Sequence, residues 1–501
     1  MKTTFTNITN ENSIPWWGAA IAALLALWMI FQSRGIINND GILYIEAAKQ
    51  FANHEWRTGF ALYNWPLYPL IIALAHSVTG LEFQTSAHAI SIIFFALTGA
   101  GITVLVREFG GDRRVMMAAI LLLCSSPYLV RSLLPMVIRD HGFLTLHIWS
   151  LIFFLRFYRD NTLKYAIGWG GTAIIATLFR IEGIIYLALL PLIILTSNTL
   201  PWIKRFELML KAQALPLALG IFMLALLISS PLSLNDLGRL KDPISLAKTM
   251  LFQLSQGLSG KAEIYGNHVL GPFLDDFSLA GLMATLILVT VIKSAGSAGW
   301  LQFAFAAFCA KLPENQLPAS RPVLKWLYFL GLAIAIVILL SVFVLSTRYL
   351  LPLATLILVA GAFGLKALFQ TIENKWIQNG LIAIIVLQVA ATLWPFHSSN
   401  HYEIEASEWI KDHIAPDKNI YFDEGRLRYY ALNNSSDRTK KPWTEVQRVL
   451  DSNELKRFDY VIVHVSQNHP QQQAWIKQKL GTPIVTFTNR HGKQVQIHEI
   501  H

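Results

Sequence analysis

The segment Trp326–Leu345 reads WLYFLGLAIAIVILLSVFVL, twenty residues in a row without a charged side chain. About 20 apolar residues in a helix cross the roughly 30 Å hydrocarbon layer of a bilayer. Comparable runs recur from Pro15 to Pro395 and then stop. We therefore predict an α-helical polytopic membrane protein with about eleven transmembrane helices, some of them short enough to be tilted or broken. The predicted spans are Ile14–Gln32, Ala87–Val106, Val115–Val130, Gly142–Phe157, Tyr165–Phe179, Ile184–Leu195, Ala212–Ile228, Phe277–Ile292, Trp326–Leu345, Leu350–Leu365 and Trp376–Trp394.

The composition excludes an ordinary soluble protein. The 501 residues are 54% hydrophobic and only 14% charged, whereas soluble domains carry about 25% charged residues. The net charge of +10 lies mainly in short loops between the apolar runs, where Lys and Arg set the topology of a membrane protein. We therefore expect contacts with membrane lipids and no binding of nucleic acid.

The loops also predict an orientation. With the N-terminus inside, the inner loops are short and hold more Lys and Arg than the outer loops, which are longer in total. The first apolar run is not followed by a small-residue cleavage site and is typical of a signal anchor. We predict a multi-pass protein of the inner (plasma) membrane, with a cytoplasmic N-terminus and a periplasmic C-terminal domain.

Two long outer loops, residues 33–86 and 231–276, interrupt this pattern. Each contains a stretch that is too short to span the bilayer or is amphipathic, Pro66–Val78 in the first and Ile244–Leu258 in the second. Such stretches are typical of helices that lie at the membrane surface.

After His397 short apolar strands alternate with helices. This pattern predicts a small α/β domain. The chain would then divide into a transmembrane region over 1–396 and a soluble extracytoplasmic domain over 397–501. The expected helices are Tyr402–His413, Arg426–Leu432, Trp443–Leu455 and Pro470–Leu480, and the expected strands are Asn419–Asp423, Tyr460–Val465, Pro483–Asn489 and Gln494–Ile500.

Ionisable side chains collect at the predicted outer ends of the membrane helices. A charge at membrane depth costs roughly 2.5–3.5 kcal/mol or more, so it is kept mainly for function or for a needed partner. Several arginines beside carboxylates suit a phosphate-bearing ligand, and one carboxylate would be left to act as a base. The residues concerned are Asp40, Arg139, Asp140, His141, Arg180, Glu182 and Arg348.

Spacing alone leaves a structural interpretation open for each of these residues. An acid in this setting also suits an exposed turn or a helix N-cap, and an arginine next to a tyrosine also suits an anchor at the membrane interface. These alternatives are Asp40 as a loop acid or cap, Asp140 paired with Arg139 or capping a helix, Arg180 with Glu182 as an ion pair, and Arg348 as an interface anchor.

Two weaker signals lie elsewhere. Asp423 and Glu424 resemble part of a metal site, but no histidine or third acid is near them in the sequence, which favours solvated loop acids. His268 lies in the second outer loop beside Lys261 and Tyr265, so we keep it as a candidate for lining the site.

Several short motifs follow one another along the membrane region. They are NDG at Asn39–Gly41 followed by Tyr44, WPLYPLI at Trp65–Ile71, RD at Arg139–Asp140, FRIEG at Phe179–Gly183 and TRYLLP at Thr347–Pro352. In this order they resemble the GT-C fold glycosyltransferases that use polyprenyl-phosphate sugars. The nearest likeness is to the group of dolichyl-phosphate-mannose–protein mannosyltransferases and aminoarabinose transferases, in which an α/β outer domain also follows the last helix.

The resemblance implies an inverting transfer of a sugar from a polyprenyl-phosphate donor to a hydroxyl acceptor on the outer face of the membrane. Asp40 would be the general base and Asp140 would support a sugar. The donor phosphate would be held by arginines, so no metal or other cofactor is expected, with a divalent metal as the less favoured alternative. His141 stands where some relatives have a second acid, which leaves the acceptor side open. The implied phosphate-binding residues are Arg180, Arg348 and Arg139, and the site-lining residues are Tyr44, Glu182 and Tyr349.

Other functions compete with this one. A lipid-linked glycan polymerase or ligase would use a different acceptor, a transporter or flippase would move a lipid-linked sugar, and an assembly subunit would need none of the outer acids. The chain shows no evident internal repeat and its charges lie at one predicted face, which favours a transferase over a transporter. The sugar, and whether the acceptor is a lipid, a protein or a glycan, are left open.

Overall fold

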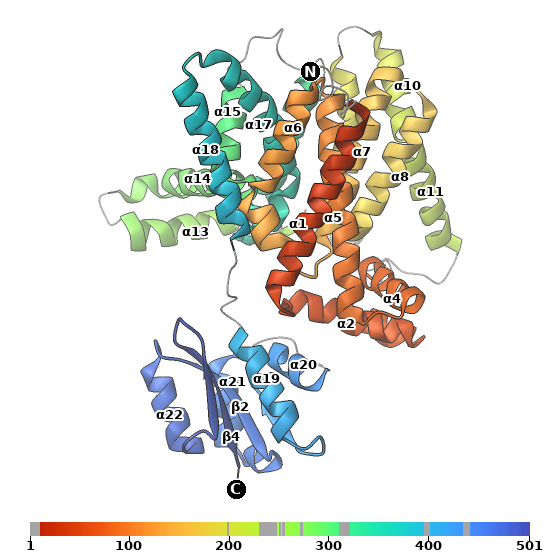
Figure 1. Ribbon diagram of the computed structural model, residues 1–501. Coiled ribbons are helices and arrows are strands. Elements are labelled where there is room, and N and C mark those ends of the chain that lie inside the picture. The colour runs from red at the N-terminus through yellow and green to blue at the C-terminus, as the bar shows by residue number, and fades with distance from the viewer. Residues whose placement is uncertain are drawn as a thin grey trace, which may run out of the picture. The chain divides into compact units, whose positions relative to one another are not determined.

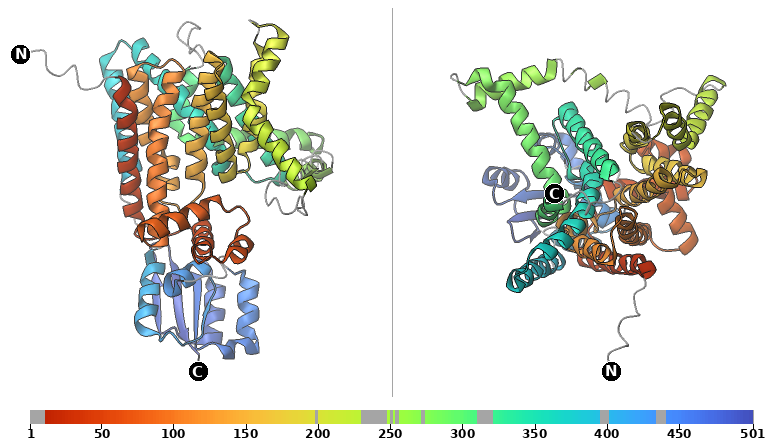
Figure 2. Two further views of the ribbon diagram at one scale, coloured as in Figure 1. Left: turned by 90° about the vertical axis from the view of Figure 1, so that its right-hand side faces the viewer. Right: turned by 90° about the horizontal axis from the view of Figure 1, so that it is seen from above.

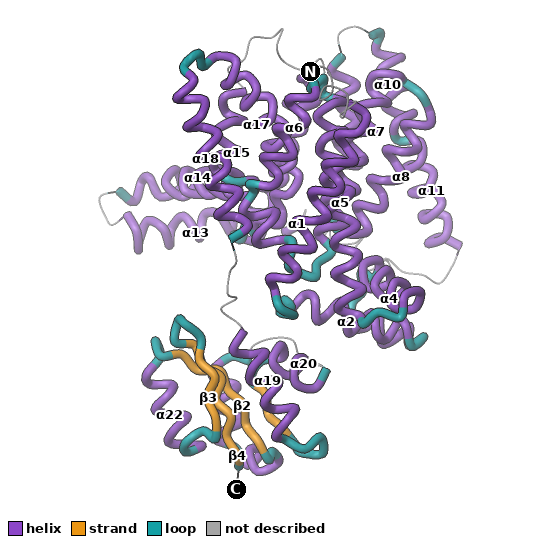
Figure 3. Tube along the Cα trace, in the orientation of Figure 1, coloured by secondary structure: helices purple, strands orange, loops and turns teal. Residues whose placement is uncertain are grey.

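The computed structural model describes residues 11–197, 200–229, 248–249, 252, 256–270, 274–309, 321–394, 401–433 and 441–500. These residues form many helices and one small sheet (Figure 1 and Figure 3). The chain divides into two compact units. The predicted division into 1–396 and 397–501 stays a prediction. The first unit comprises Met1–Leu27, Ile90–Leu134 and Arg139–Trp394, and the second comprises Trp28–Ala89, Pro135–Ile138 and Pro395–His501.

Each predicted span lies mainly within a helix or within two consecutive helices. Figure 2 shows several helices of the first unit lying side by side, among them α7 (Asp140–Asp160) and α8 (Leu163–Phe179), which pack against each other. The predicted helical membrane fold is therefore confirmed. The helices concerned are α1 (Ile14–Ser33), α5 (Phe83–Glu108), α6 (Arg113–Cys124) with η2 (Pro127–Leu133), α7 (Asp140–Asp160), α8 (Leu163–Phe179), α9 (Gly183–Leu189) with η3 (Leu190–Thr196), α10 (Trp202–Ala212) with α11 (Ala214–Ser229), α14 (Ser278–Ala298), α16 (Arg321–Val342), α17 (Leu351–Thr371) and α18 (Lys375–Leu393).

Not all of these helices are long enough to cross a bilayer unbroken. Among the described residues, six helices are long and apolar enough, namely α1, α5, α14, α16, α17 and α18. Two bent pairs raise the number to eight: α6 and η2 meet at 43°, and α10 and α11 meet at 61°. The predicted spans that remain correspond to α7, to the 17-residue α8 and to α9 with η3.

Helix α17 is buried along almost its whole length, and it packs against α15 (Trp300–Cys309), α6 and α14. Two glycines allow this close packing. A Cβ atom on Gly364 would overlap the carbonyl group of Phe305 in α15, and one on Gly361 would lie 3.0 Å from the carbonyl oxygen of Gln302. Small residues at such contacts let membrane helices approach backbone to backbone. The turn η9 (Thr347–Leu350), directly before α17, is thereby held on a firmly packed helix.

The first outer loop is helical and belongs to the second unit. It contains α2 (Asn39–Ala52), α3 (Trp56–Leu62) and α4 (Leu67–Thr79), and α4 corresponds to the predicted surface helix Pro66–Val78. The ring of the buried Tyr44 meets those of Tyr63 and Tyr68 edge-on, with centroids 5.1 and 5.2 Å apart. Such aromatic pairs add stability beyond area burial, so this cluster fixes α2 against its neighbours.

The second outer loop is described only in part. Its described elements include α13 (Leu258–Tyr265) and η6 (Gly266–Leu270). The predicted surface helix Ile244–Leu258 lies mostly outside the described residues.

The C-terminal domain contains a four-stranded sheet in the order β1-β2-β4-β3. Strands β1 and β2 are parallel, and the other two pairs are antiparallel. The observed elements match the predicted ones to within a few residues, which confirms the α/β prediction. They are α19 (His401–His413), β1 (Ile420–Phe422), α20 (Gly425–Leu432), α21 (Trp443–Asp451), η10 (Asn453–Arg457), β2 (Tyr460–Ser466), α22 (Pro470–Leu480), β3 (Val485–Thr488) and β4 (Lys493–Glu499).

Helices cover both faces of this sheet because β2 is apolar on both sides. Val461, Val463 and Val465 pack with α21 and α22. Ile462 packs on the other face with α19 and α20. Side chains alternate along a strand, so His464 shares the face of Ile462 and is directed toward α19 and α20.

Candidate functional site

Buried charges surround Asp140, the first residue of α7. Its side chain is 0% exposed. Its Oδ1 accepts hydrogen bonds from Nη1 of Arg180 and, at 3.2 Å, from Nε of Arg348. Its Oδ2 accepts from Nη2 of Arg348 at 2.6 Å. We call Asp140, Arg180, Glu182 and Arg348 the arginine cluster.

Glu182 occupies the other side of Arg180. Its Oε1 accepts from Nη2 of Arg180 at 3.0 Å, and its Oε2 accepts from Nε at 3.3 Å. All four carboxylate oxygens of Asp140 and Glu182 therefore accept from guanidinium groups. A proton on either acid would weaken these bonds, so neither suits the role of a general base.

The two arginines differ in access. Arg180 keeps 4% of its side chain exposed, and its guanidinium carbon lies 4.9 Å from the ring centroid of Tyr349 and 5.9 Å from that of Phe143. Arg348 keeps 28% exposed. A guanidinium over an aromatic ring is held by cation–π attraction. Arg180 is thus enclosed, and Arg348 is the arginine of the pair that a ligand reaches.

A close helix contact brings these residues together. Arg180 follows the last residue of α8, where the backbone turns from helical to extended. Gly142 lies half a turn into α7, and a Cβ atom there would overlap the ring of Phe179. Because Gly142 has no side chain, the end of α8 can lie against the start of α7. This contact places the guanidinium of Arg180 within hydrogen-bonding distance of Asp140.

The charges of the site do not cancel. Arg139, which precedes α7, is also buried, at 8% exposed. With Arg180 and Arg348 it makes three positive charges, against two negative ones from Asp140 and Glu182. Among these five described residues the positive charges exceed the negative ones by one. Guanidinium groups bind phosphate through paired hydrogen bonds, so the excess suits an anionic phosphate.

Asp40 and Tyr44 lie in α2 and belong to the second unit. Asp40 is partly buried in the first turn of α2, and the N-cap position is held by Asn38. The interpretation of Asp40 as the helix cap is therefore wrong. The Asn38 side chain instead accepts from the amide of Val137 at 2.9 Å. The placement of Asp40 and Tyr44 beside the arginine cluster stays a prediction.

His268 is exposed in η6, and its Nδ1 donates to the carbonyl oxygen of Ile264 at 3.1 Å. Its role in lining the site stays a prediction.

The structure corrects two further interpretations. Arg348 is not merely an interface anchor, because it binds Asp140. Asp423 and Glu424 are not solvated loop acids, since they are 3% and 7% exposed. Asp423 bonds to His464, which comes from the adjacent strand β2. The one sequence signal for this contact is a histidine inside the apolar strand Tyr460–Val465.

Comparisons with known proteins give a distant match to solved structures. No family model matches the sequence, and no curated protein does. ArnT from Cupriavidus metallidurans bound to undecaprenyl phosphate is 13% identical, with a TM-score of 0.40 over 96% of this chain and 98% of that chain. The arabinofuranosyltransferase AftD from Mycobacteria is 13% identical, with a TM-score of 0.48 over 97% of this chain and 40% of its own. Because these similarities are distant, the residues of the site have to carry the functional conclusion.

Proposed function

We propose that the protein is an inverting glycosyltransferase that moves a sugar from a polyprenyl-phosphate donor to a hydroxyl acceptor on the outer face of the membrane. The observation that carries this proposal is the buried Asp140 held between Arg180 and Arg348. This arrangement supports a preformed pair of guanidinium groups at a helix end, of which Arg348 is accessible to a lipid-borne phosphate. The order of motifs along the membrane region supports the same reaction.

In this proposal Asp140 is a positioning residue for the donor phosphate. Two guanidinium groups repel each other, and a shared carboxylate removes most of that repulsion. Asp140 thereby keeps Arg348 and the enclosed Arg180 directed at one place. Preformed donors of this kind stabilise negative charge as it develops on a leaving group. The earlier prediction that Asp140 contacts a sugar stays a prediction beside this role.

The transfer itself needs a base. The acceptor hydroxyl oxygen forms a bond to the anomeric carbon, while the bond from that carbon to the phosphate oxygen breaks and its electron pair goes to the phosphate. The acceptor proton passes to a carboxylate. Because Asp140 and Glu182 are committed to arginines, we assign this step to Asp40.

The proposal needs no metal for the leaving phosphate, because the arginines already neutralise it. It places the N-terminus in the cytoplasm and the C-terminal domain outside the inner membrane. The donor's lipid tail would lie along the membrane helices, and the sugar and the acceptor remain to be found by experiment.

The test is release of polyprenyl phosphate from a panel of polyprenyl-phosphate sugars by the purified protein, with a mixed membrane extract as acceptor source. We expect release with at least one donor. Asp40→Asn and Arg348→Gln are both expected to abolish most of it. Unchanged release by Asp40→Asn would remove the base assignment, and unchanged release by Arg348→Gln would remove the phosphate site.

Arg156→Gln is the matched control. Arg156 lies in the same helix α7, near its other end, and pairs with Glu108 at 2.8 Å. The Arg156→Gln variant therefore loses an arginine–carboxylate bond of similar length outside the arginine cluster.

Movement of the donor lipid across a vesicle membrane without any release of polyprenyl phosphate would instead support a flippase.

A further inference from the structure

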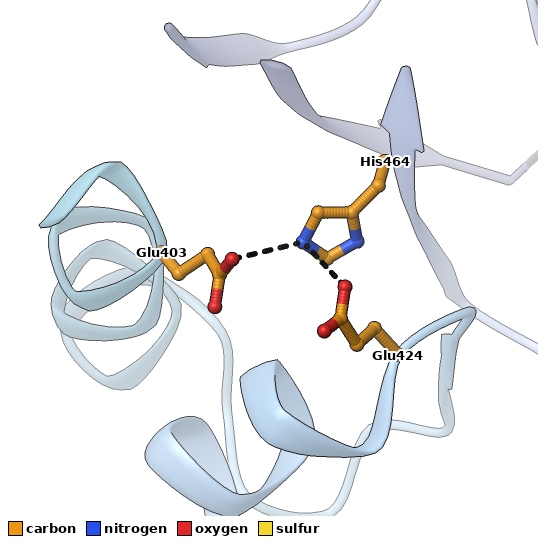
Figure 4. Close-up of side chains that lie close together, drawn as sticks. All are labelled: Glu403, Glu424 and His464. Atoms are coloured by element: carbon orange, nitrogen blue, oxygen red, sulfur yellow. Dashed lines mark ion pairs between the residues drawn. The ribbon is translucent and has the colours of Figure 1, made fainter. Parts of the chain in front are cut away.

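A second group of buried ionisable side chains lies in the C-terminal domain. Glu403 comes from α19, Glu424 directly precedes α20 and His464 comes from β2 (Figure 4). Their exposed fractions are 1%, 7% and 8%. They border a cavity of about 430 Å³, which is also lined by Tyr402, Arg426, Ser466, Asn468, His469 and Lys493.

The orientation of the His464 ring is fixed by Asp423. The Oδ2 of Asp423 accepts from the backbone amide of His464 at 2.8 Å, and its Oδ1 accepts from the ring Nδ1 at 2.7 Å. The Nδ1 atom therefore carries a proton. In the neutral ring this leaves Nε2 with its lone pair directed away from Asp423.

The Nε2 atom is directed at the two glutamates. It lies 3.5 Å from Oε2 of Glu424 and 4.0 Å from Oε1 of Glu403 (Figure 4). It is buried and has no hydrogen-bond partner among the residues that the structure describes. A lone pair facing two carboxylates is unfavourable unless a positive charge lies between them.

Arg426 supplies part of the compensating charge but not all of it. It donates to both oxygens of Glu403 at 2.6 Å and forms an ion pair with Oε1 of Glu424 at 3.0 Å. Oε2 of Glu424 is the oxygen that faces Nε2 of His464. Three carboxylates and one guanidinium leave two negative charges when His464 is neutral, or one if Lys493 of the cavity wall is counted, so a cation is favoured.

We propose that the C-terminal domain binds a divalent transition-metal ion of the Zn²⁺ type through Nε2 of His464 and one carboxylate oxygen each of Glu403 and Glu424. The three candidate ligand atoms lie within 4.8 Å of one another. Ligands about 2.0–2.2 Å from tetrahedral zinc are about 3.3–3.6 Å apart, so small side-chain movements suffice. The bond from Nδ1 to Asp423 is the support that metal-bound histidines usually have.

The site is distinct from the arginine cluster and independent of the proposed transfer reaction. Its role would be structural, because the ion would join α19, the start of α20 and β2. A mixed nitrogen and oxygen ligand set favours Zn²⁺ over Mg²⁺ or Ca²⁺, which prefer oxygen ligands alone.

The competing occupant is a proton. Burial disfavours the charged ring, but Asp423 and the two glutamates outweigh it and raise the pKa of His464 above its ordinary value. A protonated ring would donate from Nε2 to a glutamate, and no metal would then be needed. The experiment therefore has to distinguish a bound metal ion from a proton on Nε2 of His464.

The experiment uses the untagged full-length protein in detergent, stripped with EDTA, reloaded with Zn²⁺ and passed over a desalting column. Elemental analysis is expected to find about one tightly bound zinc per chain, and a tenfold excess of Mg²⁺ should not displace it. His464→Gln and Glu424→Gln should both lose this zinc. His469→Gln is the matched control, since His469 lines the same cavity outside the ligand set, and it should keep the zinc.

X-ray absorption of the zinc-loaded wild type identifies the zinc ligands directly, so this test does not depend on whether a variant folds. We expect one imidazole nitrogen with oxygen ligands. No zinc retained by the wild type would show that a proton occupies the site and would overturn the proposal. Full retention by His464→Gln, or a spectrum with several imidazoles or with sulfur, would place the metal elsewhere and would also overturn it.

Discussion

The arginine cluster at α7 and the histidine–glutamate group of the C-terminal domain use similar residues to opposite effect. In the arginine cluster every oxygen of Asp140 and Glu182 accepts from a guanidinium, and the neighbouring Arg139 adds a third positive charge to two negative ones. In the C-terminal group Arg426 serves two acids while a third, Asp423, orients His464, and negative charge is left over. The sign of the uncompensated charge, rather than the presence of ion pairs, indicates which ligand a buried site accepts.

The largest expected effect is that of Asp140→Asn. Removing one partner of a buried ion pair costs about 3–5 kcal/mol, and here it leaves two neighbouring guanidiniums without their shared acid. We expect loss of polyprenyl-phosphate release and a lower melting temperature in detergent. Asp160→Asn, at the last residue of the same helix and paired with Arg159 at 2.9 Å, is the control. Equal effects of both variants would show that the arginine cluster has no special role.

Arg348→Lys tests whether the site needs a guanidinium or only a positive charge. Lysine keeps the charge but cannot make paired hydrogen bonds. A hydrogen bond to a charged group contributes about 1.5–3 kcal/mol, so we expect release to fall by about 10- to 100-fold. A rate within twofold of the wild type would mean that Arg348 acts by charge alone.

Asp423→Asn tests the other side of the comparison. Changing the residue that orients a metal-bound histidine usually lowers metal affinity by about 10- to 100-fold. We expect a loss of this size in Zn²⁺ affinity, measured by competition with a chelating dye, and unchanged release of polyprenyl phosphate. Unchanged zinc affinity would show that Asp423 does not support the proposed metal site.

The smallest effect is expected for Gly142→Ala, which would press against Phe179. Overpacking in a tight contact typically costs about 1–3 kcal/mol. We expect a modest loss of thermal stability with reduced activity, because the end of α8 carries Arg180. The double variant with Phe179→Leu should recover both. Gly171→Ala, whose Cβ would meet Leu215 at an ordinary 3.8 Å, should change neither.

The two regions were not equally predictable from the sequence. Apolar runs such as Trp326–Leu345 predict their helices, because about 20 apolar residues are a local signal that no long-range contact has to complete. The strands and helices after His397 were also predicted from a local signal, the alternation of short apolar strands with helices. That Asp140, Arg180 and Arg348 would meet was expected from their common place at helix ends and from the motif resemblance.

The C-terminal group was missed because its residues are far apart in the chain. Asp423 and Glu424 follow β1, His464 lies on the neighbouring β2 and Glu403 lies on α19. Parallel pairing of β1 and β2 matches Phe422 with Ile462, and Asp423, the next residue, accepts from the backbone amide and the ring of His464. The spacing of these residues in the sequence does not reveal this strand register.

By itself the sequence determined the class of the protein, the positions of its membrane helices and the α/β character of its tail. These properties follow from hydrophobic runs and alternation, which act over a few turns of chain. Only the tertiary structure decided which acids are bound by arginines, which nitrogen of His464 is turned inward and what charge each group leaves over. Those outcomes depend on packing between distant segments, where a single glycine or a strand register decides which polar atoms meet.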